Sequence, residues 1–111
     1  MKIALVQMDV VHGQPVENKK HVIEMLERAL DDNPDVIVLP EMWNTGYALN
    51  ELDGLADKDG LDSQELLSHF ARKHAVAIIG GSVAIEEDGK FYNTTYVYNK
   101  SGDLINTYSK V

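Results

Sequence analysis

Two residues able to do acid–base chemistry stand at the ends of apolar runs. Glu41 lies in the segment Leu-Pro-Glu-Met-Trp over residues 39–43, and Lys110 closes a later strand-like run. A carboxylate and an ammonium at one edge of a sheet suit acyl transfer, because one can move a proton while the other stabilises an oxyanion. The 111 residues contain no cysteine. The nucleophile that this chemistry needs is therefore missing from the sequence.

The first forty residues predict the elements that place Glu41. An apolar run at residues 3–6 predicts a strand, and a helix is expected to begin at or just after Pro15 and to stop near Pro34. The inward stripe of this helix consists of apolar residues at three- and four-residue spacing, namely Val22, Leu26 and Ala29. Residues 36–39 then predict a strand that is buried on both faces. Strand, helix and strand form a βαβ unit with a parallel pair.

The rest of the chain predicts a second helix and an antiparallel meander that ends at Lys110. Residues 44–61 have a turn-forming composition, and Asp62 with Glu65 fits a capping box for a helix. Strands with intervening turns follow, at residues 76–85, 92–98 and 104–108. The fold class is thus α/β, a mixed sheet with a βαβαβ start. Because both helices could cover one face of this sheet, the other face is expected to be bare and the chain to be part of something larger.

Composition limits the function classes. A net charge of -8 and a pI near 4.8 disfavour nucleic acid and anionic membranes as partners. The 44% hydrophobic content suits one domain with a single core. The N-terminal run is too short for a signal peptide or a membrane span, so a cytoplasmic location is the default expectation.

Several segments together resemble the carbon-nitrogen hydrolase (nitrilase) superfamily, in its amidase branch. The matching segments include 39–43 with Gly46-Tyr47, Gly80-Gly81-Ser82, Tyr92-Asn93-Thr94 and Tyr108-Ser109-Lys110. Their order and spacing fit along the whole chain. The resemblance implies that residues 1–111 are the N-terminal portion of a single, incomplete hydrolase domain, part of a four-layer αββα sandwich.

The same resemblance implies a catalytic site. Glu41 matches the general base and Lys110 the lysine of a Glu, Lys and Cys set, whose cysteine lies beyond this sequence. It implies hydrolysis of a small linear carboxamide to acid and ammonia without a cofactor, and it favours an ω-amide of a dicarboxylic acid as the substrate. Because the cysteine is missing, the 111 residues alone are expected to be inactive. Homo-oligomerisation of the intact protein is also implied.

Other residues are assigned from their positions. Tyr47 and Trp43 flank the base and are candidates for a substrate pocket, together with Asn93. The Gly80-Gly81-Ser82 run is better explained by close backbone packing than by phosphate binding, because a strand follows it. His69 and His74 point to different sides of a helix, and no metal site is expected.

Two other functions compete with hydrolysis. The missing thiol and the bare sheet face allow a non-catalytic binding or assembly module derived from a hydrolase half. The βαβ opening allows a flavodoxin-like nucleotide binder, although the second strand ends in Pro-Glu where a glycine-rich turn would be expected.

Overall fold

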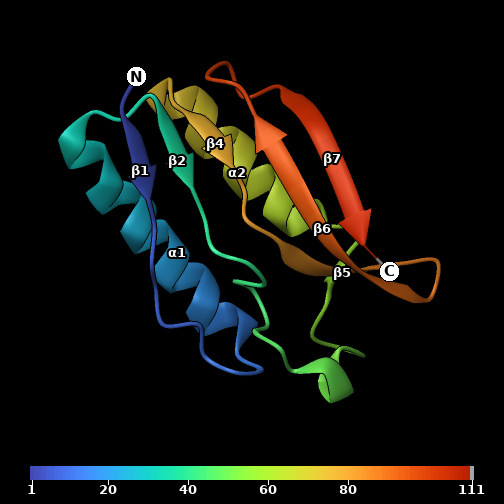
Figure 1. The fold of residues 1–111 in the computed structure, drawn as a ribbon. Coiled ribbons are helices and arrows are strands. Elements are labelled where there is room, and N and C mark those ends of the chain that lie inside the picture. The colour runs from blue at the N-terminus through green and yellow to red at the C-terminus, as the bar shows by residue number, and fades with distance from the viewer. Residues whose placement is uncertain (111) are drawn as a thin grey trace.

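A single mixed sheet carries the site, with the helices packed against it (Figure 1). The computed structural model describes residues 1–110, except for the side chain of Leu49. In these residues the sheet has the strand order β1-β2-β4-β6-β5-β3, and β7 pairs with β6. The elements are β1 (Ile3–Leu5), α1 (Pro15–Ala29), η1 (Leu30–Asp32), β2 (Val36–Val38), η2 (Leu49–Glu51), β3 (Asp57–Lys58), α2 (Leu61–His74), β4 (Ala77–Ile79), β5 (Val83–Glu87), β6 (Lys90–Tyr98) and β7 (Leu104–Lys110).

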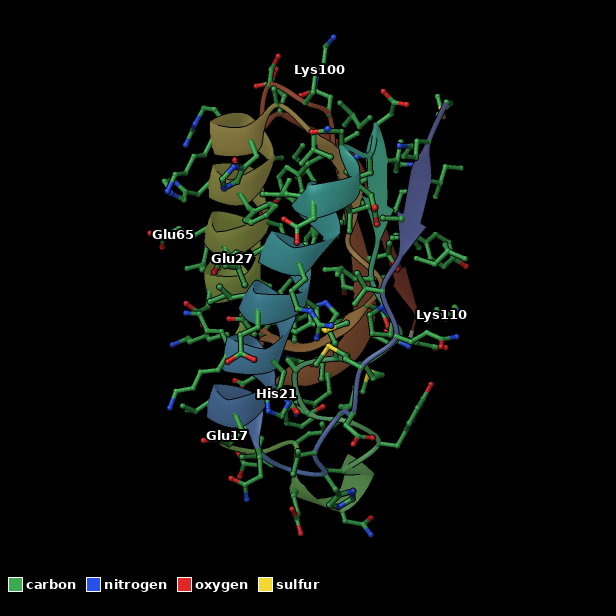
Figure 2. The ribbon with its side chains drawn as sticks, turned by 90° about the vertical axis from the view of Figure 1, so that its left-hand side faces the viewer. Glu17, His21, Glu27, Glu65, Lys100 and Lys110 are labelled. Atoms are coloured by element: carbon green, nitrogen blue, oxygen red, sulfur yellow. The ribbon has the colours of Figure 1, made fainter. Side chains whose placement is uncertain are left out.

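The predicted βαβ start and antiparallel meander are confirmed. β1, β2 and β4 are parallel neighbours, with Ala4 opposite Ile37 and Ile37 opposite Ile78. β6 then runs antiparallel to β4, β5 and β7. Residues 1–110 thus form an α/β arrangement of one helix layer on one sheet layer (Figure 2).

Both helices lie on the same side of the sheet, as Figure 2 shows in a view turned by 90°. Val22 and Leu26 of α1 are fully buried, as is Leu67 of α2, and they pack into one core with Ile37 and Ile78 of the sheet. The predicted inward stripe of the first helix is confirmed in this way. Within residues 1–110, neither α1 nor α2 has the length and hydropathy of a membrane-spanning helix.

The opposite face of the sheet is open in the described part of the chain. Apolar side chains on it remain exposed, including Leu5 at 75% and Ile79 at 40%. Val36 and Val38 are only half-buried, so the prediction that this strand is buried on both faces was wrong for residues 1–110. The physical reason is that the helices cover only the face that Ile37 occupies.

Three local predictions need correction. The second helix begins at Leu61 and has Gly60 at its N-cap without a side-chain hydrogen bond, so the capping box at Asp62 is wrong. Asp57 instead accepts hydrogen bonds from the backbone N–H groups of Asp62 and Ser63, at 3.2 and 2.7 Å. The expected strand over residues 76–85 is divided into β4 and β5 at residues 80–82. The short β3 lies in the segment that was predicted to be loop.

Candidate active site

Glu41 lies in a tight turn directly beyond the carboxyl end of β2. The next residue, Met42, has a φ of +52°, an uncommon left-handed conformation for a non-glycine residue. Ser82, which lies between β4 and β5, holds this turn: its Oγ accepts a hydrogen bond from the Met42 N–H at 2.9 Å, and its carbonyl accepts one from the Trp43 N–H at 3.1 Å. The backbone that carries Glu41 is therefore fixed to the break between β4 and β5.

The two glycines before Ser82 allow this close approach. A Cβ on Gly81 would collide with the carbonyl oxygen of Pro40 and would lie 2.6 Å from that of Leu39. A Cβ on Gly80 would lie 2.7 Å from the carbonyl oxygen of Tyr96. The interpretation of this run as close backbone packing is confirmed.

Strand direction brings Lys110 to the same edge as Glu41. β2 is parallel to β4, β4 is antiparallel to β6, and β6 is antiparallel to β7. Two reversals leave β7 running in the direction of β2, so the carboxyl ends of both strands lie at one edge (Figure 1). Lys110 is the last residue of β7, and Figure 2 shows it on the side of the sheet away from the helices.

A cavity of about 300 Å³ lies at this edge on the open face. Its lining combines apolar strand residues with the polar residues of the candidate site: Val38, Leu39, Glu41, Ile79, Gly81, Ser82, Asn93, Thr95, Tyr108 and Lys110. The Asn93 side chain donates a hydrogen bond from Nδ2 to Oε1 of Glu41 at 3.1 Å. Asn93 is also the direct cross-strand partner of Lys110. The structure thus brings Glu41, Asn93 and Lys110 together.

The two aromatic residues near the base differ in position. Tyr47 is 60% exposed, and desolvation, followed by the charge of Glu41 and a hydrogen bond to it, raises the pKa of Tyr47. Tyr47 is not among the residues that line the cavity with Glu41. Trp43 is 2% exposed and donates its indole N–H to the carbonyl oxygen of Gly80 at 2.9 Å. It borders a separate cavity of about 450 Å³ and is not brought to the cavity that contains Glu41.

The match to a family model decides the classification. The carbon-nitrogen hydrolase model matches residues 2–111. The chain belongs to the carbon-nitrogen hydrolase family. It is 44% identical over 108 residues to the 2-oxoglutaramate amidase of Bacillus subtilis, a match that covers 97% of this chain and 41% of the relative. It is also 39% identical to a protein of Staphylococcus aureus named hydrolase in agr operon, over 100% of this chain and 42% of the relative.

Solved structures show the same fold. Saccharomyces cerevisiae Nit3, a member of branch 10 of the nitrilase superfamily, superposes with a TM-score of 0.86 at 27% identity, over 100% of this chain and 44% of the other. An amidase from Nesterenkonia sp. superposes with a TM-score of 0.79 at 21% identity, over 100% of this chain and 43% of the amidase. The 111 residues therefore span less than half the length of the family members they match.

Polar residues that support the site were missed at the sequence level. Asn44 forms a reciprocal pair with the backbone of Ala84, donating from Nδ2 to the carbonyl and accepting from the N–H, both at 2.9 Å. Asn18 of α1 is fully buried and donates to the carbonyl oxygen of Asn44 at 2.9 Å. These bonds, with those of Ser82, fix residues 42–44 of this carbon-nitrogen hydrolase chain. The one local signal was the Gly-Gly-Ser run, which indicated close packing without naming its partner.

The arrangement can support acid–base chemistry at one small cavity. Its polar groups include a carboxylate, an ammonium, a primary amide and the hydroxyl groups of Ser82, Thr95 and Tyr108, and its apolar walls come from β2 and β4. Among residues 1–110 no three His, Asp or Glu side chains gather closely enough to hold a metal ion. The groups present are those that general acid–base catalysis and oxyanion stabilisation use.

Proposed function

We propose that residues 1–111 are the N-terminal portion of a single carbon-nitrogen hydrolase domain that supplies the base and the lysine of an amidase. The intact protein hydrolyses a small linear carboxamide to the acid and ammonia. Its nucleophile is a cysteine outside these residues, because the 111 residues contain none. The observation that supports this most directly is that Glu41 and Lys110, 69 positions apart in the chain, line the same cavity.

The proposed reaction runs through a thioester. Glu41 accepts the proton of the thiol, the thiolate attacks the amide carbon, and Lys110 donates a hydrogen bond to the oxyanion that forms. Glu41 returns the proton to the nitrogen as the carbon–nitrogen bond breaks, and ammonia leaves. Glu41 then takes a proton from water, the hydroxide attacks the thioester carbon, and the carbon–sulfur bond breaks as the sulfur regains the proton. No cofactor enters this sequence.

The proposed substrates are ω-amides of dicarboxylic acids. A relative at 44% identity is named 2-oxoglutaramate amidase, and a yeast relative at 29% identity is named omega-amidase. Two residues are proposed to contact the substrate: Tyr47, which is near Glu41, and Asn93, which lies in the cavity wall. Trp43 was assigned the same role from its sequence position. Because Trp43 is buried behind the turn, we propose that it supports the site indirectly, through its hydrogen bond to the backbone of Gly80.

The test uses the intact protein and measures ammonia released from 2-oxoglutaramate. Glu41→Gln and Lys110→Met are each expected to lower kcat at least about 100-fold, the usual contribution of a general base or an oxyanion donor. The matched controls are Glu87→Gln and Lys100→Met, which make the same chemical changes at exposed positions. Controls and site variants should give the same circular dichroism spectrum and melting temperature. Undiminished turnover in both site variants would refute the proposal.

A second candidate function rests on the open sheet face. Exposed apolar residues gather there, including Leu5, Ile79 and Tyr108. A binding or assembly module would bury this face against another chain. Light scattering of the 111-residue chain distinguishes the two: a monodisperse oligomer without amidase activity favours the module, whereas aggregation favours a hydrolase half that needs its remaining layers. A cytoplasmic location and homo-oligomerisation of the intact protein stay predictions.

A further inference from the structure

The Asn93 side chain has one end bonded and the other end buried without a partner. Its Nδ2 donates to Glu41 Oε1 at 3.1 Å. Its Oδ1 is inaccessible to solvent and accepts no hydrogen bond from the residues that the structure describes. A buried acceptor left unpaired is destabilising, because it has lost its hydrogen bonds to water without replacement. A donor next to Oδ1 would remove that cost.

The carboxylate fixes which way the amide points. An ionised carboxylate can only accept hydrogen bonds, so the NH₂ group of Asn93 must face Glu41 and the oxygen must face away. Lys110 lies directly opposite Asn93 across the β6–β7 pair. Side chains of directly opposite residues stand on one face of the sheet with Cβ atoms about 5 Å apart. An ammonium can only donate, so it matches the free oxygen.

From this geometry we infer that Asn93 is a positioning residue that bridges the two charged groups of the site. Its Nδ2 holds Glu41, and its Oδ1 accepts a hydrogen bond from the Nζ of Lys110 in the assembled site. The inference rests on the proposed function for the roles of Glu41 and Lys110.

A neutral amide between Glu41 and Lys110 prevents a direct ion pair between them. A carboxylate and an ammonium in direct contact form an ion pair, which occupies the lone pairs that a base needs and favours its charged form. An amide between them keeps both groups in place and leaves the second carboxylate oxygen and two ammonium protons available. Aspartate would offer only acceptors to Glu41, and an apolar residue would offer neither bond.

The test compares Asn93→Asp and Asn93→Leu in the intact protein, with Asn99→Asp as the matched control. Asn99 lies in the β6–β7 turn, where its Oδ1 accepts from the N–H groups of Ser101 and Asp103, so an aspartate keeps both bonds. Both Asn93 variants are expected to lower kcat at least about 10-fold, whereas loss of a substrate contact alone would raise KM and leave kcat unchanged. In Asn93→Asp the acid limb of the pH profile should also move to higher pH, because a second carboxylate beside Glu41 disfavours the charged base. Asn99→Asp should leave the kinetics and the pH profile unchanged.

A structure of the intact protein supplies a readout that is independent of activity. Lys110 Nζ should lie about 3 Å from Asn93 Oδ1. A direct Lys110–Glu41 ion pair, or another donor on Oδ1, overturns the bridge. So does an unchanged kcat and pH profile in Asn93→Asp when Glu41→Gln and Lys110→Met are inactive. If those two variants stay active, the proposed function fails, and the Nζ to Oδ1 distance still decides the bridge.

Discussion

Replacing Gly81 with alanine tests whether close backbone packing holds the Glu41 turn. Gly81 has a φ of +61°, and an added Cβ would collide with the Pro40 carbonyl oxygen. Pro40 directly precedes Glu41, so any movement that relieves the collision displaces the base. Gly81→Ala should therefore reduce both stability and activity.

The magnitude follows from two separable costs. Alanine in the left-handed region costs about 1–2 kcal/mol, partly offset by about 0.4–1 kcal/mol from a less flexible unfolded chain. Forcing an extra carbon against fixed backbone adds about 1–3 kcal/mol. Gly89 in the β5–β6 turn isolates the first cost, because its φ is +76° and an added Cβ would meet nothing within 4 Å. The steric part is thus the difference between Gly81→Ala and Gly89→Ala, about 1–3 kcal/mol.

The assay is equilibrium urea unfolding of both variants and the parent, with ammonia release measured in parallel. We expect a lower midpoint for Gly81→Ala than for Gly89→Ala at the same m-value, and at least about a 10-fold loss of turnover only in Gly81→Ala. Equal midpoints for the two variants would show that the carbonyl collision costs nothing and would refute the packing argument. A lower midpoint with full turnover would show that the packing of the turn affects stability but does not set the position of Glu41.

Three further predictions concern stability. Burial, followed by the charge of neighbouring Tyr96, raises the pKa of Tyr98 to about 12. In the unfolded chain the same hydroxyl ionises near pH 10, so alkaline pH favours unfolding. The contribution of neutral Tyr98 to the free energy of unfolding is therefore complete below about pH 10 and is lost between about pH 10 and about pH 12. Unfolding at pH 8 and 11.5 should show this alkaline loss in the parent and a smaller one in Tyr98→Phe. Asp57→Ala should cost about 1 kcal/mol, because it removes the carboxylate bonded to the first turn of α2, and α2 amides should exchange faster with deuterium than in the parent. Trp43→Phe should cost about 1–3 kcal/mol in thermal unfolding, since the Gly80 carbonyl loses its buried donor.

Elements with a strong local period were predictable. Apolar residues at helical spacing predicted the buried stripe of α1, and Val22 and Leu26 are fully buried. The order of strands and turns predicted the parallel start and the antiparallel meander. These features depend on a few neighbouring residues, so a single sequence contains enough information to assign them.

Features that depend on distant partners were not predictable. Ser82 bonds to Met42 and Asn44 bonds to Ala84, each over 40 positions of chain. The side chain that caps α2 is that of Asp57, which precedes the helix. It was not predicted because it lies in a segment of loop composition. The half-burial of Val36 and Val38 has the same origin, because an apolar run shows that a strand can be covered and does not show which residues cover it.

The face on which Lys110 stands depends on one irregularity that the sequence did not indicate. Near the β6–β7 turn Tyr98 pairs with Leu104, but one step further Val97 pairs with Asn106, so Ile105 is an extra residue in β7. Without this bulge the register set by the turn would place Lys110 opposite Tyr92. Successive side chains of a strand alternate between faces, so Lys110 would then point to the helix side of the sheet, away from the cavity. The bulge shifts the pairing by one residue, sets Lys110 opposite Asn93, and so brings the ammonium to the face where Glu41 lies.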